Sequence, residues 1–318
     1  MNWEEERLLY RIAKLYYDED YTQAEISKEL GIYRTTIGRM LKKARDKGIV
    51  KIHVQSNANE LFEVEEKIMR HFGMKEVMIV PSFSEQSTQN LSATIAKASN
   101  QLLNRILRDE DIVGLAWGKT LGDMVHQIGE LKPKNTLCVP LVGGPGGMNT
   151  DYHVNAITMR MANALQGKSH FINAAAVYNS KETTQEILES SFMQEIIQLW
   201  DELTVAIVGI GAQISSSNMV WSGFLGDNEQ NELKKHQAIG DICSRFYTID
   251  GEVVNSSVSE RTIGVELEKL KTLRYCIGVA NSKEKAESII GAMRGRFINT
   301  LVTNEETALE INRMIEKN

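Results

Sequence analysis

The chain contains a run of residues whose side chains could bind a polyanion. Between Arg34 and Lys51 there are seven basic side chains and one acidic side chain, Asp46. Lys and Arg neutralise phosphate groups, and Arg and Thr can also form hydrogen bonds with the edges of nucleic-acid bases. The chemistry that this spacing predicts is the recognition of a nucleic acid.

This local charge contrasts with the charge of the rest of the chain. The 318 residues include 36 Lys and Arg against 42 Asp and Glu, and residues 1–55 hold 11 of the basic and 9 of the acidic side chains. The remainder therefore has 25 basic and 33 acidic side chains. Salt limits the reach of a charge to about 10 Å, so only a local basic face can attract a polyanion to an acidic chain. We expect two domains, a small one at residues 1–56 and a larger one at residues 57–318.

A second set of residues could bind a small anion. Residues 118–120, Gly-Lys-Thr, follow one apolar run, and residues 143–147, Gly-Gly-Pro-Gly-Gly, follow another. Glycine lets backbone N–H groups approach an anion closely, and a Thr hydroxyl and a Lys ammonium add a donor and a charge. A third candidate loop precedes the helix that holds Lys283, Lys285 and Arg294.

Each of these signals also has a structural explanation. A glycine-containing turn between a strand and a helix is usually only a turn, an isolated His153 is usually a satisfied polar residue, and Lys285 alone is usually a surface charge. The GIGA motif at residues 209–212 lacks the third glycine of a dinucleotide fingerprint, so we expect no nicotinamide cofactor. The sequence predicts no other cofactor and no metal. Only the convergence of these loops at one edge of a sheet would form a pocket.

Three helices are predicted to position the basic run. In the first, apolar residues recur at spacings of three and four over residues 8–16, which describes one face of a helix. The second begins after Thr22, which is placed to form a capping box with Glu25, and it ends at Gly31. The third spans about residues 34–47 and has a second apolar face.

A short helix, a tight turn with glycine and a basic amphipathic helix are typical of a helix-turn-helix. In that motif the N-terminal part of the second helix enters the major groove of DNA. The residues expected to face base edges are Arg34, Thr35, Thr36 and Arg39. Those expected to approach phosphates are Lys42, Lys43 and Arg45. The alternative is a solvated basic helix in an all-helical domain, which the capping box and glycine turn disfavour.

The residues after the basic helix predict a wing and then a second domain. Residues 49–54 alternate in hydrophobicity, which is typical of a strand that adds a wing to a helix-turn-helix. Residues 59–72 have the spacing of a helix, with two interpretations open. It is either a linker helix that pairs with a second subunit or the first helix of the body.

Beyond residue 73, short apolar runs alternate with helical segments. The runs are VMIV, DIVGLAW, TLCVPLVG, LTVAIVGIGA, YCIGVA and FINTLVTN. Because they are apolar throughout rather than at alternate positions, they predict strands covered on both faces. We therefore expect an α/β, Rossmann-like body with a parallel sheet, in which ligands bind beyond the carboxyl ends of the strands.

The composition is typical of a soluble protein. No apolar run approaches the roughly 20 residues of a membrane span, and the N-terminal MNWEEERLLY lacks a signal-peptide pattern, so we expect a cytoplasmic protein. The cysteines, Cys138, Cys243 and Cys276, are widely separated, and we interpret them as buried free thiols.

The motifs together resemble one protein family. The segments YTQAEISKELGIYRTTIGRMLKKARDKGIV, DIVGLAWGKTL, VPLVGGPGG, TVAIVGIGA, AIGDICSRFYTIDG, ERTIGVELEKL and MRGRFINTLVTNEETA are similar to the SorC family of sugar-catabolism regulators. The resemblance implies a winged helix-turn-helix and a body like glucosamine-6-phosphate deaminase and ribose-5-phosphate isomerase that senses a phosphorylated sugar. The effector-binding residues that it implies are Gly118, Lys119, Thr120, Gly143, Gly144, His153, Asn155, Asp241 and Lys285. The contribution of Lys119 to phosphate binding stays open, because some relatives have a small hydroxyl residue there.

The resemblance implies a DNA-binding regulator of a sugar or sugar-alcohol operon, such as one for sorbose or sorbitol. The implied partners are double-stranded operator DNA, a ketose or hexitol phosphate such as L-sorbose 1-phosphate, and further copies of the chain in a homodimer or, as is common in the family, a homotetramer. Two other functions are weighed. One is an enzyme acting on a sugar phosphate, for which the sequence contains no acid–base motif, and we expect no such activity. The other is a DNA-binding scaffold whose body only oligomerises.

Overall fold

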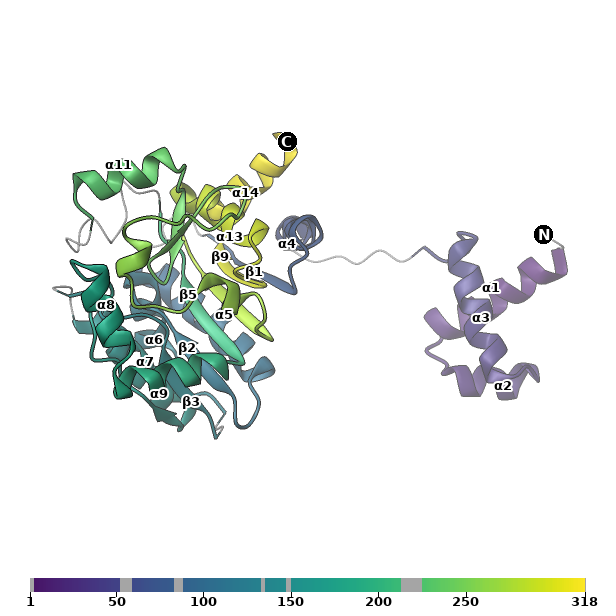
Figure 1. Ribbon diagram of the computed structural model, residues 1–318. Coiled ribbons are helices and arrows are strands. Elements are labelled where there is room, and N and C mark those ends of the chain that lie inside the picture. Colours follow the sequence, from purple (N-terminus) through teal and green to yellow (C-terminus); the bar gives the residue numbers. More distant parts are fainter. Residues whose placement is uncertain are drawn as a thin grey trace. The chain divides into compact units, whose positions relative to one another are not determined.

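Figure 1 shows a computed structural model of the protein, which describes residues 3–51, 59–82, 88–132, 135–146, 150–212 and 225–317. The chain divides into two compact units, Met1–Asn59 and Glu60–Asn318. The boundary that the sequence predicts, between residues 56 and 57, lies outside the described residues. Each unit has buried apolar clusters of its own.

The N-terminal unit contains the three predicted helices, α1 (Trp3–Tyr17), α2 (Gln23–Leu30) and α3 (Arg34–Asp46). Thr22 caps α2, since its Oγ1 accepts a hydrogen bond from the Glu25 N–H at 3.3 Å while the Glu25 carboxylate accepts one from the Thr22 N–H at 2.8 Å. Gly31 ends α2 in the left-handed conformation, with a φ of 66°. The predicted capping box and glycine stop are therefore confirmed. The core of this unit consists of Leu9, Ile12, Ala13, Leu15, Ile26, Ile37, Leu41 and Ala44.

The predicted wing strand is described only in part. Ile49 and Val50 follow α3 and pack against the cluster of Leu9, Ala13 and Ala44. The rest of the predicted strand, from residue 52 onward, lies outside the described residues. The wing therefore stays a prediction.

The C-terminal unit is built on one parallel sheet of seven strands, which confirms the predicted α/β class. The strands are β1 (Glu76–Val80), β2 (Ile112–Leu115), β3 (Leu137–Pro140), β4 (Lys168–Ser169), β5 (Val205–Gly209), β8 (Tyr275–Val279) and β9 (Thr300–Asn304). All except β4 coincide with the apolar runs that predicted them, although β1 begins one residue before its run, at Glu76. The two-residue strand β4 has no such run and was not predicted.

The strand order, β1-β9-β8-β5-β2-β3-β4, changes direction between β2 and β5. From β2 the chain adds β3 and β4 on one side, and it then returns to the other side of β2 to add β5, β8 and β9. Val113 of β2 is in register with Cys138 of β3 and with Val205 of β5. Because crossovers between parallel strands are right-handed, the reversal places connecting helices on opposite faces and opens a crevice at the carboxyl ends of β2 and β5.

Helices cover both faces of the sheet (Figure 1). The α-helices are α4 (Asn59–Phe72), α5 (Thr88–Ile106), α6 (Lys119–Gln127), α7 (Val154–Leu165), α8 (Lys181–Leu188), α9 (Ser191–Asp201), α11 (Asp227–Lys235), α12 (Leu267–Leu270), α13 (Ala286–Arg294) and α14 (Glu305–Lys317). Short 3-10 helices are η1 (Thr150–Tyr152), η3 (Ser259–Arg261) and η4 (Lys283–Lys285). An antiparallel hairpin of β6 (Gly240–Ile242) and β7 (Arg245–Tyr247) was not predicted. Within the described ranges, no helix is both long and apolar enough to cross a membrane.

Helix α4 belongs to the C-terminal unit. Val64 and Ile68 are buried in the core of that unit, and Leu61 packs against it. The Glu65 carboxylate accepts a hydrogen bond from the N–H of Ile79 in β1 at 2.7 Å. Of the two interpretations of this helix, the structure supports the first helix of the body.

The three cysteines are buried free thiols, as predicted. Burial raises the pKa of the Cys138 thiol to about 12. A thiol with so high a pKa is protonated and unreactive near neutral pH, so Cys138 serves the packing of the core.

Candidate functional site

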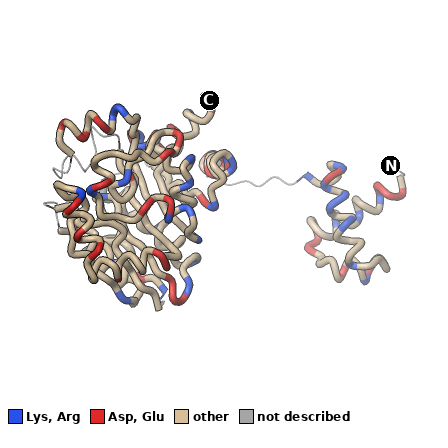
Figure 2. The backbone as a smooth tube through the Cα atoms, viewed as in Figure 1, with Lys and Arg blue, Asp and Glu red and all other residues tan. Residues whose placement is uncertain are grey.

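Helix α3 presents the residues predicted to contact DNA on the side that faces away from the core of the N-terminal unit. Its buried residues are Ile37, Leu41 and Ala44. The predicted contact residues, all exposed except the half-buried Thr36, are Arg34, Thr35, Thr36, Arg39, Lys42 and Lys43. Figure 2 shows Lys and Arg gathered along this helix. An exposed basic helix after a tight turn has the form of a helix that enters a major groove.

Two of the basic side chains on α3 already have partners on α1. Lys43 forms an ion pair with Glu5 of α1, and this hydrogen bond lowers the pKa of Glu5. Arg45 donates a hydrogen bond to the Tyr17 hydroxyl at 2.7 Å. Lys42, by contrast, forms no ion pair with any described residue. Lys42 therefore has more charge available to a phosphate than Lys43.

In the C-terminal unit, a cavity lies at the carboxyl ends of β2 and β5. Its walls come from the loops after β2 and β5, the β6–β7 hairpin and η4. The cavity volume of about 50 Å³ is several times the roughly 10–15 Å³ that one water molecule requires. It lies where the strand order reverses, which is the ordinary ligand site of an open α/β sheet. The predicted residues that line it are Gly118, Lys119, Thr120, Asp241 and Lys285.

The N-terminus of α6 forms one wall of this cavity. Gly118 precedes the helix with a φ of 125°, a conformation that favours glycine, and its N–H donates to the Tyr152 carbonyl at 3.2 Å. The N–H groups of Lys119, Thr120 and Leu121 have no hydrogen-bond partner among the described residues, as is usual in the first turn of a helix. These free donors, together with the helix dipole, favour an anion at this position.

The ammonium group of Lys119 has a partner of its own. It lies 2.5 Å from a carboxylate oxygen of Asp123 and 5.9 Å from the centre of the Tyr152 ring. The hydrogen bond to Asp123 raises the pKa of Lys119. The spacing of four residues is typical of an ion pair on one helix face and is visible in the sequence. In this structure Lys119 therefore offers its backbone N–H to the cavity, while its charge is already paired.

Lys285 and Asp241 line the same cavity from different elements. Lys285 is the last residue of η4, and Asp241 lies in β6. Burial lowers the pKa of Lys285, and burial raises the pKa of Asp241 to about 6. The Lys285 charge and a hydrogen bond from the Ser244 backbone N–H lower the pKa of Asp241 and so offset part of the effect of burial. Neither side chain has an ion-pair partner in the part of the chain that is described, so both are available to a polar ligand.

The glycines of the second predicted loop do not line this cavity. The Gly143 N–H donates to the Ile263 carbonyl at 2.9 Å, and the Gly144 N–H donates to the Ala174 carbonyl at 2.7 Å. Residues 147–149 of the same loop lie outside the described residues. The described part of the loop uses its N–H groups to hold neighbouring backbone segments.

His153 and Asn155, which were predicted to contact the sugar, also lie outside the cavity lining. His153 caps α7, since its Nδ1 accepts a hydrogen bond from the Asn155 N–H at 3.2 Å. The Asn155 side chain bonds both the N–H and the carbonyl of Ile172, each at 3.0 Å. Burial lowers the pKa of His153. Both side chains thus have structural partners, which is the alternative that the sequence left open for His153.

Two parts of the cavity were missed by sequence reasoning. At Gly211 a β carbon would lie 1.9 Å from Oδ1 of Asp241, and the Gly211 N–H donates to the Asp241 carbonyl at 2.8 Å. Gly211 belongs to the GIGA motif. Its glycines indicate that another group lies close to the backbone here, and that group is strand β6 rather than a dinucleotide. The other part is the turn at residues 243–244 of the β6–β7 hairpin. It contains none of the residues that usually mark such a turn, so the sequence carried no signal for it.

The body of the chain matches a family of ligand-binding domains. Residues 56–312 match the family model described as "Putative sugar-binding domain". This range includes every element that lines the cavity.

The chain is also similar to regulators over nearly its whole length. It is 40% identical over 309 residues to the Sorbitol operon regulator of Klebsiella pneumoniae, a match that covers 96% of this chain and 98% of that protein. It is 28% identical over 308 residues to the Deoxyribonucleoside regulator of Bacillus subtilis, covering 97% of this chain and 98% of that protein. The crystal structure of the full-length Sorbitol Operon Regulator SorC from Klebsiella pneumoniae matches with a TM-score of 0.76 and 39% identity, over 96% of this chain and 98% of that chain. The similarity therefore includes the N-terminal unit as well as the body.

Proposed function

The chain belongs to the SorC family of transcriptional regulators with a sugar-binding domain, and from this premise we propose which ligands it binds and where. It binds double-stranded operator DNA through α3 and a phosphorylated sugar in the cavity at the carboxyl ends of β2 and β5. One observation carries the proposal for the sugar phosphate. An ammonium and a carboxyl, neither with an ion-pair partner among the described residues, converge in one cavity with the free N-terminus of a helix.

The N-terminus of α6 is the position that suits the phosphate group. The free N–H groups of Lys119, Thr120 and Leu121 supply donors, and Lys285 supplies a positive charge without an ion-pair partner among the described residues. A phosphate would also compensate the buried ammonium for the water that it has lost. Asp241 then accepts hydrogen bonds from hydroxyl groups of the sugar.

The effector is a ketose or hexitol phosphate, such as L-sorbose 1-phosphate, and the operon is one for uptake and breakdown of sorbose or sorbitol. Support for this choice comes from the 40% identity to a protein named for the sorbitol operon. The chemistry of the cavity agrees with either class, because a ketose and a hexitol both carry a phosphate and a chain of hydroxyl groups. The protein acts on this ligand by binding alone, without converting it.

Regulation follows from linkage between the two ligands. If the sugar phosphate binds one arrangement of subunits more tightly than another, it shifts the population toward that arrangement and changes the affinity for DNA. Paired helix-turn-helix units read half-sites about 34 Å apart or multiples of that distance. A monomer would gain little from this geometry, so the protein forms a homo-oligomer, a homotetramer, through its acidic C-terminal units.

The test of the effector is thermal unfolding of wild type, Lys285→Ala and Lys283→Ala with a panel of phosphorylated and unphosphorylated sugars. A ligand at 100 times its dissociation constant adds about 2.7 kcal/mol of stability, so the true effector class gives a clear shift. We expect the shift in wild type and Lys283→Ala and its loss in Lys285→Ala. Lys283 is the matched control because it lies in the same short helix, is exposed, and has Glu310 as its partner at 3.8 Å.

Other outcomes of this experiment would replace the proposal. A flat response to every phosphorylated sugar would overturn the effector and favour a DNA-binding scaffold. A shift that is equal in all three proteins would move the site away from the cavity. Turnover of a sugar phosphate by the purified protein would show that the body acts as an enzyme.

A further inference from the structure

Residues 243 and 244 form the turn of the β6–β7 hairpin, and both have a left-handed backbone. The φ angle is 53° at Cys243 and 62° at Ser244. Two-residue hairpin turns of this kind are normally built from Gly, Asn or Asp, because a β carbon is disfavoured at positive φ. A Cys and a Ser here store strain, and such strain persists only where the surrounding structure fixes the backbone.

Arg245, the residue after the turn, anchors it. The guanidinium donates to the carbonyls of Ser259 at 2.9 Å and Gly264 at 3.2 Å, and it lies 2.5 Å from a carboxylate oxygen of Glu266. Gly264 approaches the turn closely, since a β carbon there would lie 2.9 Å from the Cys243 carbonyl oxygen. The turn is thereby fixed to the segment that follows the hairpin.

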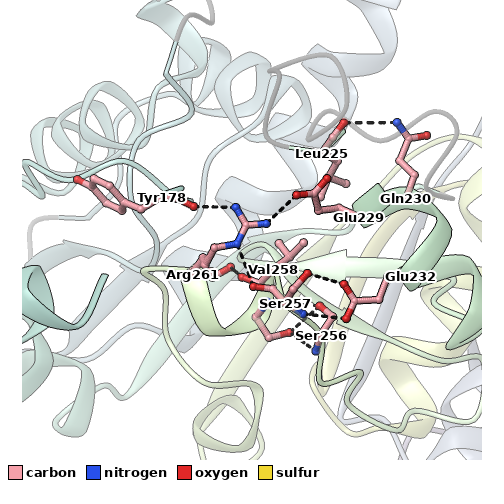
Figure 3. A network of polar contacts seen from close by, with 11 residues as sticks. Tyr178, Leu225, Glu229, Gln230, Glu232, Ser256, Ser257, Val258 and Arg261 are labelled. Carbon is pink, nitrogen blue, oxygen red and sulfur yellow. Dashed lines mark hydrogen bonds and ion pairs between the residues drawn. The ribbon is translucent and has the colours of Figure 1, made fainter. Parts of the chain in front are cut away.

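That segment is itself held by the network in Figure 3. Arg261 donates to the Tyr178 carbonyl at 2.9 Å and pairs with Glu229 of α11 at 3.0 Å. The carboxylate of Glu232, also on α11, accepts a hydrogen bond from the Ser257 N–H at 3.0 Å. The side chains of Arg261 and Glu229 are only 16% and 26% exposed. Contacts from two separate parts of the unit therefore fix the backbone around the turn.

Ser244 carries a buried hydroxyl group without a partner. The residue is 1% exposed, and its Oγ has no hydrogen-bond partner among the described residues. Leaving a buried hydroxyl unpaired is unfavourable, so such a group calls for an explanation. The hydroxyls of Ser99 and Thr303 are also buried and unpaired, but only Ser244 of these three lines the cavity. Its backbone N–H also bonds the Asp241 carboxyl.

We propose that Ser244 is a specificity-determining residue of the effector site and that its Oγ forms a hydrogen bond with a hydroxyl group of the bound sugar or sugar alcohol. The inference rests on the proposed function, since it requires a hydroxyl-bearing ligand in this cavity. Asp241 accepts from one hydroxyl, and Ser244, which can donate and accept, bonds a neighbouring one. This pair fits a chain of adjacent hydroxyls and rejects an analogue that lacks one of them, because the buried partner would then remain unpaired.

The test compares the binding of sorbitol 6-phosphate, L-sorbose 1-phosphate and D-fructose 6-phosphate to wild type and Ser244→Gly by isothermal titration calorimetry. Glycine removes the hydroxyl and suits a positive φ, so the melting temperature without ligand should stay the same or rise. The affinity for whichever compound binds wild type should fall about tenfold, which corresponds to the loss of one hydrogen bond. If Ser244 only shapes the turn, the substitution would leave the melting temperature the same or higher without lowering the affinity.

Three further variants separate the hydroxyl from the backbone. Ser244→Ala removes the same hydroxyl and keeps the β carbon, so it should lose affinity to the same extent as Ser244→Gly. Gln166→Gly relieves a positive φ of 53° at the end of α7, outside the cavity lining. Ser99→Ala removes another buried, unpaired hydroxyl outside the cavity lining. Both controls should bind as tightly as wild type.

The possible failures are distinguishable. If wild type binds a sugar phosphate and both Ser244 variants bind it equally well, the inference is overturned and the proposed function stands. If wild type binds no phosphorylated sugar at all, the proposed function is overturned and the inference falls with it. A loss that is equally large in Gln166→Gly or Ser99→Ala would also overturn the inference, because the effect would then not depend on the cavity.

Discussion

The two units of the protein present their charged side chains in opposite ways. On α3 several cations lie side by side and exposed, whereas the cavity encloses one ammonium, Lys285, and one carboxyl, Asp241. Exposed charges are screened by salt and each contributes little, so the basic helix depends on their number. Enclosed polar groups have lost their water and bind strongly to whatever replaces it. Single substitutions should therefore matter more in the cavity than on α3.

The largest effect is expected where the cavity wall has no room for another atom. In Gly211→Ala the new β carbon would lie 1.9 Å from Oδ1 of Asp241, so the Asp241 side chain or the backbone beside it must shift. We expect loss of effector binding and a decrease of about 1–3 kcal/mol in the free energy of unfolding. Calorimetry and urea unfolding measure the two quantities.

The matched control for this substitution is Gly129→Ala. Gly129 is exposed, and a β carbon there would lie 3.6 Å from its nearest neighbour, which is an ordinary contact. This variant should fold and bind as wild type does. Equal losses of effector binding and of stability in the two variants would contradict the proposed difference between the crowded cavity and the rest of the unit.

The second prediction concerns the pH dependence that Asp241 imposes. Burial raises the pKa of Asp241 from its ordinary value of 3.8 to about 6. The folded protein therefore binds this proton more tightly than the unfolded chain, so this group makes the free energy of unfolding fall as the pH rises from about 4 to about 6. Asp241→Asn removes this cost, and at pH 7 it should be more stable by up to about 3 kcal/mol while binding the effector more weakly.

Urea unfolding over that pH range measures this effect. The exposed Asp109→Asn serves as the control and should follow the wild-type profile. If Asp241→Asn has the same free energy of unfolding as wild type at pH 7, the ionised Asp241 carboxyl does not destabilise the fold. The proposed contrast between the enclosed and the exposed charges would then be wrong.

The smallest effects are expected on α3, where they would sharpen the comparison. Lys42→Ala should weaken binding to all duplexes alike and reduce the slope of log affinity against log salt by about one. Lys43→Ala should have a smaller effect, because Glu5 already neutralises part of its charge. Glu5→Gln should strengthen binding for the same reason. Gel shifts at several salt concentrations measure all three, and a larger loss in Lys43→Ala than in Lys42→Ala would contradict this order.

Much of the fold could be predicted because its signals are local. The capping box of Thr22 and Glu25 and the left-handed Gly31 act within one helix, and the structure shows both. Strands β1, β2, β3, β5, β8 and β9 could be predicted because a strand that is covered on both faces is apolar along its whole length. Strand β4 and the β6–β7 hairpin have only two or three residues per strand, too few to show a pattern.

The candidate site was predictable only in part. Residues 118–120, Asp241 and Lys285 do meet in one cavity, but the resemblance to a family identified them together, since each was an ordinary turn residue or surface charge by itself. Gly143, Gly144, His153 and Asn155 lie in motifs of the same family, yet their groups bond to neighbouring backbone.

The amino-acid sequence alone determined the helix-turn-helix, the class of the sheet and the contrast between a basic N-terminal unit and an acidic body. These properties depend on residues that are close in the chain, and for such residues the spacing in the sequence determines their relative positions in space. Only the tertiary structure decided which polar groups remain unpaired. It joined Lys119 to Asp123, and among the described residues it left Lys285 and Asp241 without ion-pair partners and the Ser244 hydroxyl without a hydrogen-bond partner in one cavity. The reason is that the pairing of a buried group depends on which distant strands and loops the topology brings beside it.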